Sequence, residues 1–357
     1  MVRELARSPV IASARIGWVD TAKGLGIILV VVGHVLRGLV ASSVIAMTPA
    51  VAYLDAWIYA FHMPLFFFLS GLFLARSAAR PTIEFVRDKI GTIAYPYFVW
   101  SLITLSIKSP LGQLVNQPRT LSEVPEILYR PIEQFWFLYV LFLLSIFVGL
   151  ALKSGIRPWG IVVIALLLYP GVWPLYWSGF APFELCRSDA IYLGLGVTFG
   201  GYPPLHSFAD AGKIKITLAV VAIVGLSTLT WFASLLEATH SHSLDLVLAL
   251  NGTGGIVAVA VLVSRTKIDS AISFLGRYSL EIFVAHTIAT AAIRILFQQY
   301  WHVGAAGPYI VLCTIVGLYG PIFLAVGLKR IGFRWVFTMP KKDGLENFQK
   351  NDGLRLP

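Results

Sequence analysis

Residues 20–34, DTAKGLGIILVVVGH, begin a long apolar run that has a cation near its start and an imidazole within it. Lys23 and His34 are eleven residues apart, which on an α-helix is within roughly 20° of three full turns. Both side chains therefore share one helix face, about 16 Å apart along the axis. One interpretation is a lysine that snorkels to the membrane surface and a histidine bonded to a neighbouring helix. The other is a functional site, because ionisable groups at membrane depth are costly.

The composition indicates a membrane protein. Of the 357 residues, 57% are hydrophobic and only 13% are charged, which predicts an all-α, polytopic bundle of transmembrane helices. The formal net charge is +10, but the basic residues stand at the ends of apolar segments, so we exclude nucleic-acid binding. Cys186 and Cys313 are too few and too far apart for a disulfide framework or a metal site.

The apolar segments predict about ten spans, with both termini in the cytoplasm. We divide the chain into a cytoplasmic N-terminal segment at 1–21, a transmembrane domain at 22–330 and a polar cytoplasmic tail at 331–357. Segment 188–202 contains Asp189 and several glycines, and for it a re-entrant segment is the alternative. The predicted spans are 22–41, 51–75, 91–107, 134–152, 159–176, 188–202, 214–236, 244–264, 272–298 and 307–328.

The basic residues predict the orientation of the bundle. If the N-terminus is cytoplasmic, most of the 28 lysines and arginines fall on the cytoplasmic side, as the positive-inside rule requires. They lie in the N-terminal segment, in the loops near residues 80, 155, 210 and 267, and in the C-terminal tail. An even number of spans is consistent with this distribution.

Small and polar residues surround Lys23. Asp20 precedes it by three residues, so the two side chains can pair on one helix face. Gly24, Gly26 and Gly33 leave the helix thin, so that another helix or a ligand can approach its backbone; packing against a helix is the simpler explanation.

The second predicted span contains FHMPLFFFLSG. Its His62 and Ser70 lie eight residues apart and near one helix face, and Pro64 should kink the helix. The alternative role for His62 is to cap carbonyls that the kink frees. The basic loop that follows includes Arg87 and Lys89, which indicate orientation or collect an anionic cytosolic ligand.

Further candidates lie in later segments. Glu281 and His286 occur in LGRYSLEIFVAH, five residues apart, and each needs a polar partner in the bundle or water. Arg294 follows near the predicted outer surface. Trp136, in QFWFLYVLF, is typical of an aromatic belt. The cluster Glu184, Arg187 and Asp189 is most simply a local ion pair.

Four of these stretches resemble the acyltransferase 3 family of integral membrane acyltransferases, and more narrowly its fucose 4-O-acetylase-like branch. They are WVDTAKGLGIILVVVGH, FHMPLFFFLSG, QFWFLYVLF and LGRYSLEIFVAH, in the family's order, and the resemblance runs over about residues 15–330. The first stretch is the specific one: a basic residue, ten intervening residues, then histidine, here Lys23 and His34. Many members have arginine at the first position, and the lysine found here cannot make the bidentate phosphate contacts of an arginine.

The resemblance implies transfer of an acyl group, usually acetyl from cytoplasmic acetyl-CoA, to a sugar hydroxyl. His34 would be the general base, with Lys23 and Asp20 as catalytic partners. The length of the pantetheine arm of CoA is of the same order as the ~16 Å between Lys23 and His34. The CoA phosphates could therefore bind Lys23 and the loop with Arg87 and Lys89 while the thioester reaches His34. Residues assigned to substrate binding or support are His62, Ser70, Trp136, Glu281 and His286. No metal and no permanently bound cofactor are expected.

The expected partners are acetyl-CoA, a polysaccharide, oligosaccharide or lipid-linked sugar, and membrane lipid; the expected location is the bacterial cytoplasmic (inner) membrane. Direct transfer and a relay through an acylated residue both remain open, as do the acceptor, succinyl in place of acetyl, and the oligomeric state. The competing hypotheses are a proton-coupled transporter or flippase of a glycolipid or small solute, with embedded His, Glu and Asp as proton relays, and a non-catalytic membrane scaffold.

Overall fold

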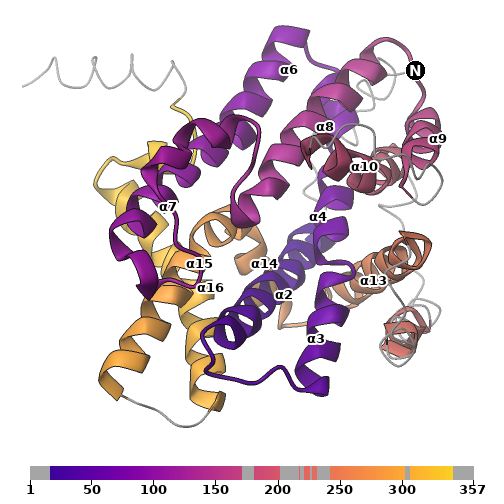
Figure 1. Ribbon diagram of the computed structural model, residues 1–357. Coiled ribbons are helices and arrows are strands. Elements are labelled where there is room, and N and C mark those ends of the chain that lie inside the picture. The colour runs from indigo at the N-terminus through magenta and orange to yellow at the C-terminus, as the bar shows by residue number, and fades with distance from the viewer. Residues whose placement is uncertain are drawn as a thin grey trace, which may run out of the picture.

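The computed structural model describes residues 17–170, 181–201, 217, 221–225, 227–230, 242–301 and 306–340. Every regular element in these ranges is a helix, so the predicted all-α class is confirmed for the part of the chain that the structure describes (Figure 1). The N-terminal segment 1–16, the tail beyond residue 340 and most of the predicted span 214–236 lie outside the described residues.

Helix α2 (Gly17–Ala41) lies at the centre of the bundle (Figure 1). It forms one uninterrupted helix from before Lys23 to beyond His34, which confirms the helical premise of their spacing. Apolar residues of α2 are buried along its whole length, among them Ala22, Ile27, Val31 and Leu39. Its packing partners are α3 (Pro49–Tyr59), α4 (His62–Gly71), α13 (His242–Val263), α14 (Asp269–Arg277), α15 (Ser279–Leu296) and α16 (Ala306–Arg330).

Two glycines let α14 lie directly against α2. A Cβ on Gly24 would overlap the backbone carbonyl of Ile272, and a Cβ on Gly276 would overlap the carbonyl of Asp20. Thr21 of α2 also donates a hydrogen bond to the carboxylate of Asp269 in α14. The predicted close approach at Gly24 is therefore confirmed, and the approaching group is a helix.

The second predicted span, 51–75, is broken in two. Helix α3 ends at Tyr59 and α4 begins at His62, with Phe61 outside helical geometry at φ −142° and ψ −12°. Pro64 explains the break, because its ring excludes a helical carbonyl four residues earlier and it has no N–H to donate. The predicted kink at Pro64 is thus confirmed as a break one turn before it.

The middle of the chain forms the other half of the bundle. Helices α5 (Leu74–Ala78) and α6 (Thr82–Lys89) lead through a π-helical turn, Ile90–Ala94, into α7 (Tyr95–Leu111). A loop with the 3₁₀ segment Leu121–Leu128 then leads to α8 (Trp136–Lys153), α9 (Pro158–Leu168) and α10 (Ala181–Gly200). Gly71 and Gly196 bring α4 and α10 into backbone contact.

Among the described residues, seven helices are long and apolar enough to cross a membrane, fewer than the ten predicted. They correspond to the predicted spans beginning at 22, 51, 91, 134, 244, 272 and 307. The described part of the predicted span 159–176 contains the shorter α9, and α10, which includes residues 188–200 of the predicted span 188–202, is helical but is not among the seven. The cytoplasmic location of both termini remains a prediction.

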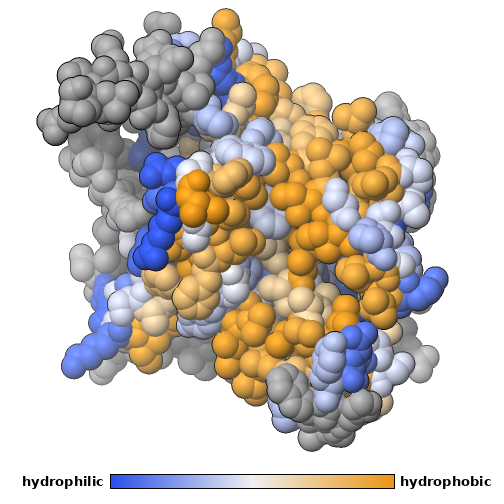
Figure 2. Space-filling model, turned by 90° about the vertical axis from the view of Figure 1, so that its left-hand side faces the viewer, coloured by the Kyte–Doolittle hydropathy of each residue, from blue (hydrophilic) through white to orange (hydrophobic). Residues whose placement is uncertain are grey.

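Several connections in the described part of the chain can be placed at one or the other end of the bundle. In Figure 1 the α2–α3 connection lies at the same end as the C-terminal end of α15, and α6 lies at the opposite end. Asn116 of the loop after α7 donates a hydrogen bond to the carbonyl of Gly38, at 2.8 Å, so this loop joins the first end. Apolar residues cover most of the described surface visible in Figure 2, as expected for contact with lipid.

Candidate active site

A cavity of about 750 Å³ lies beside the second half of α2. From α2 it is lined by residues between His34 and Ala41 and by no residue before His34, so His34 stands at its inner end. Its volume is within the range of about 300–1,000 Å³ that is typical of small-molecule sites. The other polar residues that line it are Arg37, Tyr59, His62, Lys108, Asn116, Gln117, Glu133, Gln134, Tyr169, Ser188, Asp189, Tyr192, His242, Asp245, Thr287, Thr290 and Arg294.

Three histidines from three helices make the same local bond. The Nδ1 atoms of His34, His62 and His286 lie 2.9, 2.9 and 3.0 Å from the carbonyl oxygens of Val30, Ile58 and Ile282, each four residues earlier. A carbonyl only accepts, so each Nδ1 donates, and the neutral imidazole then has its lone pair on Nε2. The tautomer of each ring is thus assigned from its hydrogen bond: Nδ1 carries the proton, and Nε2 is the basic nitrogen.

The rings of these histidines form a cluster with Tyr59. His34 and His286 meet edge to face with ring centroids 4.9 Å apart, and Tyr59 lies 6.0 Å from His34 and 4.6 Å from His62. His34 and His62 line the cavity, whereas His286 is fully buried and its Nε2 has no hydrogen-bond partner in the described part of the chain. His286 therefore supports His34 from the side away from the cavity.

An arginine and an aspartate hold Tyr59 in place. The guanidinium carbon of Arg37 lies 3.1 Å from the Tyr59 ring centroid, and Arg37 donates two hydrogen bonds, of 2.6 and 2.8 Å, to Asp55. A bidentate arginine–carboxylate pair stacked on an aromatic face is geometrically specific. Arg37 follows His34 by three residues on α2, so this arrangement sets the orientation of the tyrosine next to His34.

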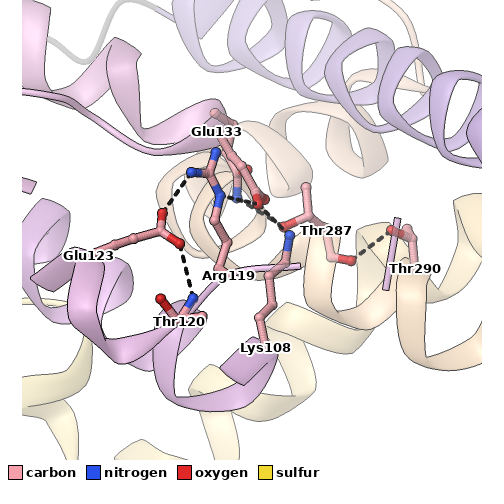
Figure 3. Close-up of polar contacts among 8 residues, drawn as sticks. Lys108, Arg119, Thr120, Glu123, Glu133, Thr287 and Thr290 are labelled. Atoms are coloured by element: carbon pink, nitrogen blue, oxygen red, sulfur yellow. Dashed lines mark hydrogen bonds and ion pairs between the residues drawn. The ribbon is translucent and has the colours of Figure 1, made fainter. Parts of the chain in front are cut away.

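A second polar network surrounds Glu133, which lines the cavity together with Lys108 (Figure 3). Glu133 accepts a hydrogen bond from Lys108 and lies 4.0 Å from Arg119, which also pairs with Glu123 at 2.7 Å. The backbone of Glu133 has φ +45°, a left-handed conformation that residues other than glycine seldom adopt. This strained turn lies shortly before two further residues that line the cavity, and strain of this kind is typical of functional sites.

Those two residues are Gln134 and Trp136. Gln134 is 5% exposed and donates a hydrogen bond of 2.9 Å to the hydroxyl of Thr287 in α15. Trp136 begins α8 and lines the cavity, with its ring centroid 6.3 Å from that of Phe67. The turn at Glu133 thereby links the loop before α8 to the helix that contains His286.

The structure brings together only some of the predicted site residues. His34, His62 and Trp136 line the cavity, and His286 contacts His34. The remaining predicted residues do not line it: Asp20 and Lys23 in the first turns of α2, Ser70 at the end of α4, Arg87 and Lys89 at the end of α6, and Glu281 in the first turn of α15.

The structure also shows the contacts of the residues for which alternative interpretations were open. His34 bonds to its own helix, and no hydrogen bond from it to a neighbouring helix is found among the described residues, which corrects the histidine part of the first interpretation of the Lys23–His34 pair. His62 does cap the carbonyl of Ile58 at the end of α3, and it also faces the cavity. The predicted local ion pair forms between Arg187 and Glu184 at 2.7 Å, while Asp189 lines the cavity instead.

The residues that sequence analysis missed are Arg37, Asp55 and Tyr59, together with the site roles of Glu133 and Gln134. Arg37 had a signal, because it lies one turn from His34 on the same apolar helix. Tyr59 and Asp55 had none, since their position depends on the break before α4. Among the described residues no group of three or more His, Cys, Asp and Glu side chains is arranged to hold a metal ion.

The fold and the cavity together define a helical membrane protein with a histidine-centred site. The chain belongs to the acyltransferase 3 family, whose model, described as an acyltransferase domain, matches residues 16–326. Comparison with curated proteins and with solved structures finds no match. Membership of this family supports a membrane acyltransferase, and the match contains every residue that lines the cavity.

Proposed function

We propose that this protein transfers an acetyl group from acetyl-CoA to a hydroxyl of a sugar in a polysaccharide, an oligosaccharide or a lipid-linked glycan. The observation that supports this most directly is the placement of His34. It lies at the inner end of a cavity of small-molecule size, and its Nδ1 is bonded to a backbone carbonyl, so Nε2 is the available base. Imidazole is the side chain best suited to accept a proton near neutral pH.

In the proposed reaction Nε2 of His34 accepts the proton of the acceptor hydroxyl. The hydroxyl oxygen then attacks the thioester carbonyl carbon, the C–S bond breaks, and the CoA thiolate takes the proton from the imidazolium. The products are an O-acetyl ester and CoA thiol. A relay through an acetylated residue is the alternative route, and if that residue were His34, its Nε2 would act as the nucleophile and another group would have to accept the hydroxyl proton.

The position of the cavity suggests that the two substrates enter from opposite ends. The cavity extends from His34 toward the C-terminal end of α2, whereas Lys23 lies about 16 Å away toward the N-terminal end. We assign the cavity to the acceptor sugar and the Lys23 end to the CoA phosphates, with Arg87 and Lys89 as further basic candidates near the predicted cytoplasmic surface. The thioester would then meet the acceptor hydroxyl at His34.

The lining of the cavity supports a polar acceptor. Gln134, Thr287 and Asn116 offer amides and hydroxyls, and Trp136 and Tyr59 offer aromatic faces, on which the apolar faces of sugar rings can pack. A glycan acceptor suits the fucose 4-O-acetylase-like branch of the family, and we place the protein in the bacterial cytoplasmic membrane. Ser70 and Glu281, which do not line the cavity, would contribute only through the helices that they belong to.

The donor site is tested first by binding. Purified protein should unfold at a higher temperature in acetyl-CoA or CoA, because a ligand that binds only the folded state stabilises it. Lys23→Ala should weaken CoA binding by about 1.5–3 kcal/mol, and Lys23→Arg should restore it; the control is Lys267→Ala, an exposed lysine outside the cavity. Equal CoA affinity in wild type and Lys23→Ala would make Lys23 structural.

The reaction itself is tested by release of CoA thiol and by acetylation of an added glycan. Transfer of acetyl to sugar, dependent on protein, would support the enzyme. Solute uptake driven by a proton gradient in liposomes without CoA, with no thermal shift by CoA, would support the transporter instead.

A further inference from the structure

We infer that Arg294 forms a subsite for an anionic substituent on the acceptor, such as the carboxylate of a uronic acid. The inference rests on the proposed function, in which the cavity beside His34 holds the acceptor. Arg294 lines that cavity and is only 6% exposed. It lies two turns beyond His286 on α15, near the C-terminal end of the helix.

The pairing of the cavity's cations singles out Arg294. Arg37 is neutralised by the two hydrogen bonds that it donates to Asp55, and Lys108 is paired with Glu133. Arg294 has no carboxylate within ion-pair distance in the described part of the chain. The one hydrogen bond described for its guanidinium is 3.0 Å long, from Nη1 to the amide oxygen of Gln298.

The neighbours of Arg294 are neutral. Cys313 and Thr290 line the same part of the cavity, and the Thr290 hydroxyl donates to the carbonyl of Thr287. Asp189, the acid that is buried in the cavity wall on α10, is not within ion-pair distance of Arg294. Most of the N–H donors of this guanidinium are therefore left for a group inside the cavity.

A structural explanation accounts for only part of this placement. A cation near the C-terminal end of a helix is favoured by the helix dipole, and Arg294 occupies the last turn of α15. The stabilisation by the helix dipole is small, whereas a charge without an opposite charge in a membrane-embedded bundle is costly. An arginine fork is also the side chain whose geometry best matches a carboxylate or phosphate, which favours an anionic ligand.

The inference is tested by binding without any acyl donor, so that its outcome does not depend on catalysis. The probes are methyl glycosides of glucuronic and galacturonic acid, each compared with its neutral parent hexoside. Binding to the detergent-solubilised full chain is measured by saturation-transfer NMR and by thermal shift. Wild type should bind each acidic glycoside about tenfold more tightly than its neutral partner.

Three variants complete the test. Arg294→Gln should abolish the preference and leave binding of the neutral glycosides unchanged, whereas Arg294→Lys should retain part of it. Arg130→Gln is the matched control, because Arg130 is 76% exposed on the loop before α8 and does not line the cavity. Size-exclusion and thermal-unfolding profiles establish that each variant is folded.

The inference is overturned if wild type binds the acidic glycosides no more tightly than the neutral ones, including no binding of either, or if the preference survives in Arg294→Gln. A preference for acidic glycosides together with no acetyl transfer would leave the subsite in place and reject the proposed reaction.

Discussion

The imidazole of His286 lies edge to face against that of His34, with the ring centroids 4.9 Å apart and the planes at 81°. The two rings come from α15 and α2, and only the His34 ring faces the cavity. His286 is fully buried behind it, so the position of the proposed base depends on a second histidine that does not contact the acceptor. Each ring is further fixed by the bond from its Nδ1 to its own helix.

Replacing His34 should mainly reduce the chemical step. We expect His34→Ala and His34→Gln each to lower the rate of acetyl transfer by about 10²-fold or more, because neither side chain can accept the hydroxyl proton. Binding of CoA should be unchanged. The measurement is CoA release under single-turnover conditions, at equal amounts of folded protein in the membrane. An active His34→Gln variant would mean that His34 only positions the substrate, and full activity in both variants would exclude the mechanism.

Replacing His286 separates support from catalysis. His286→Ala should leave a hole behind His34, lower stability by about 2–4 kcal/mol and reduce kcat with little change in KM for the acceptor. His286→Phe keeps an aromatic ring against His34 and should retain much more activity than His286→Ala. If His286→Phe is as inactive as His34→Gln, His286 itself transfers a proton. Thermal unfolding and steady-state kinetics distinguish these results.

The contact between α2 and α14 should depend on glycine at position 276. Gly276→Ala puts a methyl group into the carbonyl of Asp20, so the helices must separate, and we expect a loss of about 1–3 kcal/mol. Gly327→Ala is the control: it lies within α16 with open space around it, and it should be neutral or slightly stabilising. Thermal unfolding of both variants in one detergent gives the comparison. Equal effects would mean that the close approach of α14 is unimportant for stability.

The pair of Lys108 with Glu133 should be coupled more strongly than an exposed pair. Their side chains are 15% and 11% exposed, against 76% and 38% for Arg130 and Glu126. A double-mutant cycle with alanine at both positions should give about 1–3 kcal/mol for the first pair and less than about 1 kcal/mol for the second. If the coupling energy of Lys108 with Glu133 were as small as that of Arg130 with Glu126, Arg119 alone would suffice to hold Glu133.

The topology predicts which residues can be labelled from outside the cell. Single cysteines placed at Ser43 and Gln117, near the end of α2 and in the loop after α7, should react with an impermeant maleimide in intact cells. Cysteines near residues 80, 155 and 267 and in the C-terminal tail should react only after the membrane is opened. Labelling of the tail in intact cells would reverse the orientation. Protein that retains only its native Cys186 and Cys313 measures the background.

The features of the fold and the site that depend on interactions between residues close in the sequence were predictable from the sequence. Helical periodicity made the continuous helix through Lys23 and His34 predictable, together with the face that the two residues share. The break near Pro64 was predictable because the proline backbone cannot continue a helix normally. The role of Gly24 in close packing was also predictable, although the partner, Ile272 of α14, was not. The family motif, too, is confined to short stretches and pointed to His34 and His286 separately.

Only the tertiary structure decided which of these residues meet. It placed His286 against His34, joined Arg37 of α2 to Asp55 and Tyr59 of α3, and left Lys23 and Glu281 outside the cavity. The physical reason is that residues facing lipid and residues facing a neighbouring helix are equally apolar in a membrane bundle, so hydropathy locates a helix but does not say which way it is turned. The rotation and partners of each helix come from packing between segments far apart in the chain, and with them comes the site.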